Sequence, residues 1–251
     1  MTSERADRER RGSRRVTVAG IAAVLALIGI GVAAMASRKD RQGATAERAT
    51  SPAAAAATPG LPLAVDQEPD LLIPSRTKGD SAAPITIYEV ADFQCPACRE
   101  FWKETLPGLE REYIRTGKAR IVFINFPIAS IHRNAIAAHV AAMCAAQHGR
   151  FWTMHDLLYE QQLEWGQLAD PQPFFRKLAA QAGLTVDALQ SCETTGRARF
   201  LVDAETETLA RAGVRSTPSF IVQGALLAGA APLVVWRPIL DSIYAAVTAG
   251  R

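Results

Sequence analysis

Cysteine is scarce in this chain of 251 residues, which contains only Cys95, Cys98, Cys144 and Cys192. The pair Cys95 and Cys98 is the one Cys-x-x-Cys in the sequence. A structural zinc site needs further Cys or His ligands at compatible spacings, and no second Cys-x-x-Cys is present to supply them. The pair therefore favours a redox centre over a zinc site, and two inert thiols that lie together by chance are the remaining alternative.

Clusters of basic residues are lacking over most of the chain. From Ala49 onward there are 18 Lys and Arg residues against 20 Asp and Glu residues. Nucleic-acid binding depends on clustered Lys and Arg side chains that contact phosphates, so we do not expect it here. No glycine-rich phosphate loop and no metal-ligand motif is visible either, and we expect neither a cofactor nor a metal.

Basic and apolar residues are concentrated near the N-terminus. Residues 1–15 carry six arginines against three acids, and residues 16–36 ("VTVAGIAAVLALIGIGVAAMA") form a run of 21 residues without a charge. As a helix, this run would span about 30 Å, enough to cross a hydrocarbon core. The basic flank favours a cytoplasmic N-terminus and export of the rest. We predict a single membrane anchor at 16–36, or alternatively a cleaved signal peptide; both place the remaining chain in the periplasm or on the outer face of the cell membrane.

Residues 37–79 are rich in Ala, Pro and Thr and show no sustained apolar period. This composition predicts a disordered linker. The folded domain is then expected to occupy residues 80–251.

The pattern from residue 84 onward predicts an α/β domain. Two β-branched segments, 84–90 and 119–128, flank a helical segment with one apolar face, which implies a parallel strand pair with a right-handed crossover. Residues 131–213 read as helical. Strands at 218–222 and 225–230 and a helix at about 233–247 complete the chain. We therefore predict an α/β fold with an inserted all-helical subdomain.

The position of the cysteine pair suggests its chemistry. Cys95 falls where a strand meets the N-terminus of a helix, and Cys98 falls one turn inside that helix. Unpaired N–H groups and the helix dipole favour a thiolate at Cys95. The three-residue spacing would let Cys98 resolve a mixed disulfide formed at Cys95.

A second feature is the proline that begins the strand at 218–222. A cis peptide at Thr217-Pro218 would leave the backbone beside the sulfurs open for pairing with an extended substrate. A trans bond at an ordinary strand start is the alternative.

Taken together, the Cys95-Pro96-Ala97-Cys98 motif after a strand, the helical insertion and the late Thr217-Pro218 resemble the DsbA-like branch of the thioredoxin superfamily, over residues 70–249. The resemblance implies a thioredoxin fold around the insertion. It also implies that Cys95 is the exposed nucleophile, Cys98 the resolving cysteine and Pro218 a cis-proline that faces them.

The resemblance implies two further roles. Glu89 corresponds to an acid that is often buried in the family, where it would act as a general base for Cys98; a solvent-facing glutamate is the alternative. Some family members carry a second disulfide in the insertion, which implies a Cys144–Cys192 bridge; two buried thiols are the alternative.

The function implied is that of an exported thiol–disulfide oxidoreductase. It would exchange its disulfide with cysteines of client proteins as an oxidase and be regenerated by a membrane redox partner. A reductase or isomerase fed by a membrane electron donor and a non-catalytic thioredoxin-fold binding module are the alternatives, and we expect a monomer. Because Ala97 stands where the most oxidising members have histidine, we expect a less oxidising disulfide. The four histidines, His132, His139, His148 and His155, are expected to be surface or packing residues.

Overall fold

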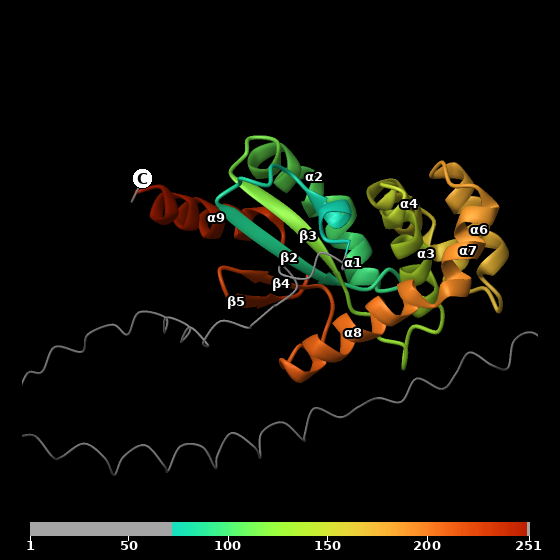
Figure 1. The fold of residues 1–251 in the computed structure, drawn as a ribbon. Helices are drawn as coiled ribbons and strands as arrows, with labels where there is room; N and C mark the ends of the chain where they lie inside the picture. The colour runs from blue at the N-terminus through green and yellow to red at the C-terminus, as the bar shows by residue number, and fades with distance from the viewer. Residues whose placement is uncertain (1–71, 250–251) are drawn as a thin grey trace, which may run out of the picture. The chain divides into compact units, whose positions relative to one another are not determined.

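The computed structural model describes residues 72–249, coloured in Figure 1. The predicted basic segment (1–15), the predicted anchor or signal peptide (16–36) and most of the predicted linker lie outside the described residues. Within residues 72–249, no helix combines the length and apolar character that a membrane span requires.

The described residues form a five-stranded sheet in the order β1-β3-β2-β4-β5. β2 and β3 pair in parallel at its centre, and the other neighbouring pairs are antiparallel. The expected parallel crossover is therefore present, with its helical connection between β2 and β3. The strands are β1 (Thr77–Lys78), β2 (Ile85–Ala91), β3 (Ala119–Asn125), β4 (Ser219–Val222) and β5 (Ala225–Ala228).

The connection between β2 and β3 is one continuous helical segment of mixed type. It begins as α1 (Pro96–Glu100) and includes α2 (Leu106–Leu109). A π-helical turn stands on each side of α2, over Phe101–Thr105 and Glu110–Ile114. Pro107 lacks the N–H that a regular helix would use, which is one reason for a wider turn at this point. The segment packs with α9 (Leu233–Thr248) on one face of the sheet, through Phe101, Phe220 and Trp236.

The predicted helical insertion (131–213) corresponds to helices between Ala135 and Arg211. Figure 1 shows α3, α4, α6 and α7 gathered beside the sheet, with α8 running back along β3. The helices are α3 (Ala135–Gln147), α4 (Phe151–Glu160), α5 (Gln162–Trp165), α6 (Gln172–Gln181), α7 (Val186–Thr195) and α8 (Arg197–Arg211).

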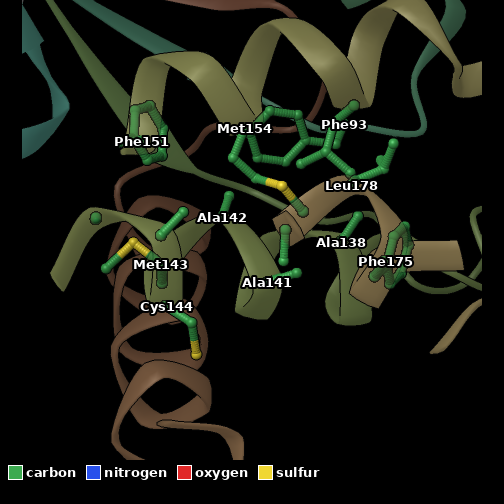
Figure 2. Packing of buried hydrophobic residues seen from close by; sticks show 14 of the residues in the cluster. Phe93, Ala138, Ala141, Ala142, Met143, Cys144, Phe151, Met154, Phe175 and Leu178 are labelled. Atoms are coloured by element: carbon green, nitrogen blue, oxygen red, sulfur yellow. The ribbon is translucent and has the colours of Figure 1, made fainter. Parts of the chain in front are cut away.

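The insertion has its own hydrophobic core, and this core continues to the cysteine pair. Small side chains on α3, among them Ala138 and Ala142, face larger ones on the neighbouring helices, such as Met154 of α4 and Phe175 of α6 (Figure 2). The same cluster of buried residues contains Phe93, Cys95 and Cys98. The insertion is thus packed against the redox motif rather than attached at a distance from it.

The folded domain begins earlier in the chain than the sequence predicts. Residues 74–78, which the sequence analysis assigns to the linker, form a 3₁₀ turn (Pro74–Arg76) and strand β1. The predicted end of the linker at residue 79 is therefore wrong. Arg76 is fully buried and forms an ion pair with Glu205 of α8, with Nη2 and Oε1 2.6 Å apart. The sequence gives no sign of this pair, because Glu205 lies 129 residues from Arg76.

Further hydrogen bonds surround this ion pair. Glu205 Oε2 accepts from the backbone N–H of Asn125 at 2.8 Å and from its side-chain amide at 2.7 Å. Arg76 Nη1 donates to the Phe123 carbonyl at 2.9 Å. A buried ion pair is tolerated when such bonds satisfy both ions, and here they join β3, α8 and the start of the domain.

The structure joins Cys144 of α3 and Cys192 of α7 in a disulfide, with an S–S distance of 1.95 Å. This is the pairing that the family resemblance implies. It links two helices of the insertion across 48 residues of sequence.

We expect Arg76→Met to lower the free energy of unfolding by about 3–5 kcal/mol, because it leaves the buried Glu205 carboxylate without its cation. Denaturant unfolding followed by circular dichroism measures the loss. Arg199→Met is the matched control, because Arg199 pairs with Asp203 at the surface of α8, the helix that carries Glu205. This substitution should cost about 0.5 kcal/mol or less. Equal losses in the two variants would contradict a structural role for the buried pair.

Candidate active site

The turn between β2 and α1 holds the two cysteines at different depths. Cys95 is the N-cap residue of α1 and is 7% exposed, whereas Cys98 is fully buried. The Cys95 N–H donates to the Asp92 carbonyl at 3.0 Å, and the Asp92 N–H donates to Cys98 Sγ at 3.5 Å. Both cysteines are thiols in the structure. The arrangement leaves Cys95 as the sulfur that a second molecule can approach.

Hydrogen bonds lower the pKa of the Cys95 thiol to about 6. The largest contribution is the hydrogen bond from the Cys98 thiol, while burial acts in the opposite direction. Further lowering comes from the Thr217 side chain and from the backbone N–H groups of Cys98 and Ala97 at the start of α1. Cys95 is therefore mostly a thiolate at neutral pH.

The pKa of Cys98 is shifted the other way. Burial raises it well above the usual value, and the hydrogen bond to Cys95 and the Cys95 charge raise it further. Cys98 therefore stays protonated while Cys95 is ionised. For Cys98 to act as a nucleophile, a base has to remove its proton.

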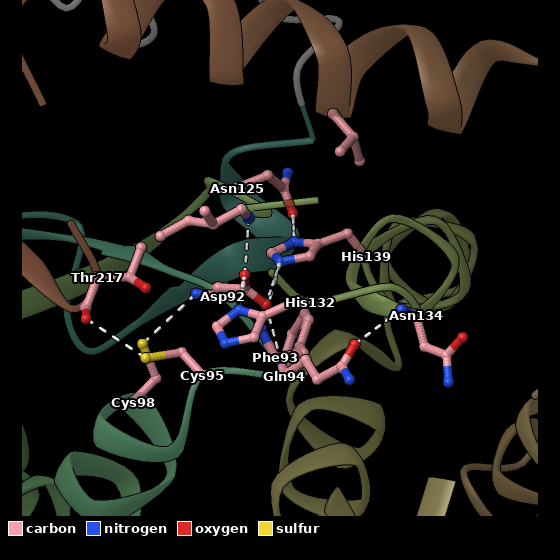
Figure 3. A network of polar contacts seen from close by, with 12 residues as sticks. Asp92, Phe93, Gln94, Cys95, Cys98, Asn125, His132, Asn134, His139 and Thr217 are labelled. Carbon is pink, nitrogen blue, oxygen red and sulfur yellow. Dashed lines mark hydrogen bonds and ion pairs between the residues drawn. The ribbon is translucent and has the colours of Figure 1, made fainter. Parts of the chain in front are cut away.

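Thr217 lies beside the sulfurs of Cys95 and Cys98 (Figure 3). The Thr217-Pro218 peptide bond is cis, and the Thr217 carbonyl accepts a hydrogen bond from Cys95 Sγ at 3.4 Å. The Thr217 hydroxyl is buried and has no hydrogen-bond partner in the thiol form, so it is free to donate to a Cys95 thiolate. Residues separated by 122 positions in the sequence therefore meet at Cys95.

Glu89 lies on β2 between Phe123 of β3 and Phe220 of β4, which are its partners in the sheet register. Its side chain is fully buried and neither carboxyl oxygen has a hydrogen-bond partner among the described residues, so the solvent-facing alternative is contradicted. Burial raises the pKa of Glu89 to about 8, against a lowering by Lys78 and with a further rise from Asp156. The Glu89 carboxyl group is therefore largely protonated at neutral pH.

Asp92 is a site residue that the sequence analysis missed. Its Oδ1 accepts from the Gln94 N–H at 2.7 Å, and its Oδ2 accepts from the Ile128 N–H at 2.8 Å (Figure 3). The same oxygen lies 2.7 Å from His132 Nδ1. The hydrogen bond to Asp92 raises the pKa of His132, and it packs this histidine against the turn that precedes Cys95.

His139 of α3 supports the same turn. The Phe93 N–H donates to His139 Nε2 at 3.3 Å, and His139 Nδ1 lies 2.7 Å from Asn125 Oδ1. Burial lowers the pKa of His139 to about 4, so its ring is neutral and can accept at Nε2 while donating at Nδ1. Because Asn125 also donates to Glu205, these bonds connect the turn before Cys95 to the buried ion pair.

Gln162 of α5 fastens the helical insertion to the motif. Its side-chain amide donates to the carbonyls of Phe93 at 2.7 Å and Cys95 at 3.0 Å. In the other direction, the side chain of Gln94 bonds with residues of the insertion. Its Nε2 donates to the Gly166 carbonyl at 2.9 Å, and its Oε1 accepts from the Asn134 N–H at 2.8 Å. No pattern in the sequence marks Gln162, because it lies 67 residues from Cys95 and glutamine has no characteristic spacing in such sites.

No group of three or more metal-ligating side chains occurs within residues 72–249. The described site consists of a dithiol and a buried acid, held by a network of hydrogen bonds.

The fold and this site define the class of protein. The family model described as Thioredoxin (Thioredoxin_4) matches residues 73–242, and the chain belongs to this family. Within the thioredoxin superfamily it is DsbA-like, with a thioredoxin-like α/β fold and the helical content of its structural neighbours.

Two solved structures show the likeness of fold. Crystal structures of alpha-DsbA1 from Wolbachia pipientis and of oxidised BdbD from Bacillus subtilis give TM-scores of 0.62 and 0.61, at 20% and 19% sequence identity. The first match covers 70% of this chain and 93% of the other, and the second covers 67% and 92%.

Curated relatives share shorter stretches. The chain is 38% identical over 84 residues to a probable disulfide bond formation protein D of Bacillus anthracis, which is 34% of this chain and 39% of that protein. It is 31% identical over 162 residues to a protein of Salinispora tropica named Na(+)/H(+) antiporter NhaA 3, which is 62% of this chain and 23% of that protein. The chain thus spans well under half the length of these relatives.

The lowered pKa of Cys95 predicts how its reactivity depends on pH. We expect the rate of Cys95 alkylation by iodoacetamide to rise with a midpoint near pH 6, where the pKa of Cys95 lies. Mass spectrometry of protein quenched at short times measures the rate at each site. Cys98, buried and with a raised pKa, should stay unmodified at pH 7; equal labelling of both thiols would contradict the asymmetry.

The raised pKa of Glu89 predicts a pH-dependent stability. The pKa of Glu89 in the folded protein, about 8, lies above its usual value of 4.5. The contribution of this carboxyl group to the free energy of unfolding is therefore fully present below pH 4.5 and is lost as the pH rises through 8. Glu89→Gln imitates the protonated acid, so the variant should become increasingly stable relative to the wild type between pH 5 and about 8.5. Denaturant unfolding at several pH values measures the difference. A difference that does not change with pH would contradict the shifted pKa.

Proposed function

We propose that this protein is an exported thiol–disulfide oxidoreductase that introduces disulfides into client proteins through Cys95 and Cys98. The observation that carries the proposal is the unequal pair of sulfurs. Cys95 is 7% exposed with a pKa lowered to about 6, and Cys98 is fully buried with a raised pKa. Such a difference lets one sulfur meet the client while the other completes the exchange.

In the oxidising direction, a client thiolate attacks Sγ of Cys95 in the Cys95–Cys98 disulfide. The S–S bond breaks, Cys98 leaves as a thiolate, and a mixed disulfide joins the client to Cys95. A second client thiolate then attacks the client sulfur of this mixed disulfide. Cys95 leaves as a thiolate, and its low pKa makes it a good leaving group. The client loses two electrons, which reduce the enzyme disulfide to the dithiol.

Glu89 serves this reaction as the proton donor and acceptor for Cys98. The Cys98 thiolate that leaves in the first step is disfavoured by burial, and the protonated Glu89 carboxyl can supply its proton. In the reverse direction the Glu89 carboxylate takes the proton from Cys98 before that sulfur attacks. A carboxyl with a pKa of about 8 suits both directions near neutral pH.

Thr217 and Pro218 form the place where the client backbone binds. The Thr217 carbonyl lies 3.4 Å from Cys95 Sγ, so a client strand that pairs with this segment brings its own cysteine to the nucleophile. Main-chain pairing of this kind gives affinity with little demand on sequence, which fits an enzyme that acts on many clients. The Cys144–Cys192 bridge stays outside the exchange, because it lies in the insertion and both of its cysteines are buried.

The rest of the proposal concerns location and partners. The apolar run at 16–36 supports a single membrane anchor, which would hold the domain on a linker in the periplasm or on the outer face of the cell membrane. A membrane redox partner would then reoxidise the dithiol after each cycle. Relatives named disulfide bond formation protein D support oxidation as the direction. The alternative functions are those of a reductase or isomerase and of a non-catalytic binding module, and the experiments below distinguish them from an oxidase.

Two serine variants of the full-length protein test the function. We expect Cys95→Ser to lose the ability to refold a reduced client oxidatively, because the Cys95–Cys98 disulfide that the client thiolate attacks cannot form. Cys98→Ser, given an oxidised client, should instead accumulate a mixed disulfide: the Cys95 thiolate displaces one sulfur of the client disulfide, and no Cys98 sulfur is present to release the client. Non-reducing electrophoresis and the recovery of client activity measure both effects.

The result that would contradict oxidoreductase function is a Cys95→Ser variant as active as the wild type, which would favour the binding module. Reduction of an oxidised client in preference to oxidation of a reduced one would favour the reductase. Cys144→Ala with Cys192→Ala is the control, and it should keep its exchange activity.

A further inference from the structure

Besides Thr217, three buried polar side chains near the cysteines have atoms that no other described residue satisfies. They are both carboxyl oxygens of Glu89, the hydroxyl of Tyr159 and Nε2 of His155. All three side chains are fully buried. Each unmet hydrogen bond in a protein interior costs about 1–3 kcal/mol, so three together point to a feature that the fold maintains.

The three groups share neighbours, which places them around one space. Glu89 is paired in register with Phe123, and the ring of Phe123 meets His155 edge-on at 5.5 Å between centroids. Phe93 stacks on Phe123 at 4.8 Å and lies 5.1 Å from the ring of Tyr159. His155 and Tyr159 are one turn apart on α4, with ring centroids 5.0 Å apart. The sheet and α4 therefore enclose these polar groups together.

Tyr159 also lies on the Cys98 side of this space. Its ring stacks on Trp102, which follows α1, and its carbonyl accepts a hydrogen bond from Arg99 Nε at 2.9 Å. Burial raises the pKa of the Tyr159 hydroxyl, and the charges of Cys98 and Glu89 raise it further. The phenol is therefore a neutral hydroxyl that can donate one hydrogen bond and accept another.

Asp156 connects the same region to solvent. His155 Nδ1 lies 2.8 Å from Asp156 Oδ1, which also accepts from Trp102 Nε1 at 3.0 Å, and the Asp156 side chain is 49% exposed. Burial acts to raise the pKa of Asp156, but its hydrogen bond with His155 and further contacts lower it overall. An ionised Asp156 keeps the proton of the neutral imidazole on Nδ1, so His155 Nε2 presents a lone pair to the interior.

The unmet groups are complementary. Tyr159 offers a donor, a protonated Glu89 offers a donor and an acceptor, and His155 Nε2 offers an acceptor. A water molecule in a protein interior is typically held by two to four such partners, about the number present here. The charged groups that face Glu89 are Lys78 of β1, Asp156 of α4 and Cys98 of α1.

We propose that Glu89, Tyr159 and His155 enclose an internal water site that passes the proton exchanged by Cys98 to and from solvent at Asp156. Tyr159 and His155 are positioning residues in this route, because they act on Glu89 and not on the sulfurs. The proposal rests on the proposed function, in which Glu89 exchanges a proton with Cys98.

The proton balance is simple. When a client opens the disulfide, the Cys98 thiolate takes the proton of Glu89. The Glu89 carboxylate then gains a proton through the water and the Tyr159 hydroxyl, each of which gives up one proton and receives another. During reoxidation of the dithiol, the outgoing proton adds to His155 Nε2 while Nδ1 releases its own proton to Asp156 and solvent, which leaves the ring protonated at Nε2. When the next client opens the disulfide, Nε2 returns that proton to the water, and Nδ1 regains one from solvent through Asp156. No electrons move along this route, and reversal of the steps serves the opposite direction.

Tyr159→Phe in the full-length protein tests the route, because it keeps the ring and removes the hydroxyl alone. The first readout is the infrared C=O band of the protonated Glu89 carboxyl, assigned by its absence in Glu89→Gln. We expect Tyr159→Phe to move this band to higher wavenumber, because the carboxyl loses a hydrogen-bonded neighbour. The second readout is the rate at which reduced glutathione opens the Cys95–Cys98 disulfide at pH 7, which should fall about tenfold or more.

Tyr113→Phe is the matched control. Tyr113 also has a buried ring, but its hydroxyl bonds with Asp241 Oδ1 at 2.9 Å on the α9 side, so both readouts should equal those of the wild type. His155→Phe removes Nε2 while keeping a ring in the cluster, and it decides the question if Tyr159→Phe does not fold. We expect it to slow the opening of the disulfide and to move the Glu89 band.

A wild-type band and a wild-type rate in the folded variant would overturn the proton route. That result would leave the proposed function intact, as long as Cys95→Ser abolishes exchange. If Cys95→Ser keeps full activity, the proposed function itself fails, and the two failures are thereby distinguished.

Discussion

The free energy difference between a thiolate at Cys95 and a thiolate at Cys98 is the constraint on which the rest of the site depends. The first turn of α1 offers backbone N–H groups to Cys95, and the Cys98 thiol adds the largest stabilising bond. Burial makes the same charge unfavourable only one helical turn further along. Both effects follow from placing a Cys-x-x-Cys at the junction of a central strand and a helix.

The surrounding structure keeps this junction in place. Asp92, His139 and Gln162 bond the residues just before α1, and they come from the end of β2, from α3 and from α5. Through Asn125 the network reaches the buried pair of Arg76 and Glu205. The helical insertion therefore acts as a support for the nucleophile, and its core is continuous with the motif.

The site also contains a buried polar group whose hydrogen bonds are unmet, which lowers the stability of the fold. Glu89 is buried without a hydrogen-bond partner in the described part of the protein, and its pKa of about 8 reflects that cost. A buried acid at this depth destabilises the fold at neutral to alkaline pH, and in the proposed mechanism it supplies the proton that Cys98 needs. Functional sites commonly combine reduced stability with shifted pKa values in this way.

The sequence predicts much of the fold, because its signals there are local. The strands around 84–90 and 119–128, the helical character of 131–213 and the place of Cys95 before a helix all follow from residues close together in sequence. Arg76 and Gln162 could not be predicted, because their partners lie 129 and 67 residues away and leave no periodic pattern. His132 illustrates the same limit, since only the return of the chain after β3 brings it to Asp92. Glu89 was recognised by family resemblance, while its burial became evident only from its neighbours in the sheet.

The central claim is that stabilisation of the Cys95 thiolate makes the disulfide an oxidant, and the reduction potential of the pair tests it most directly. Equilibration with graded glutathione buffers, followed by the fluorescence of Trp102 one turn beyond Cys98, gives this value. We predict a potential between about −120 and −180 mV, within the range of disulfide-donating enzymes. A potential near about −270 mV, as for thioredoxin, would contradict the account and indicate a reductase.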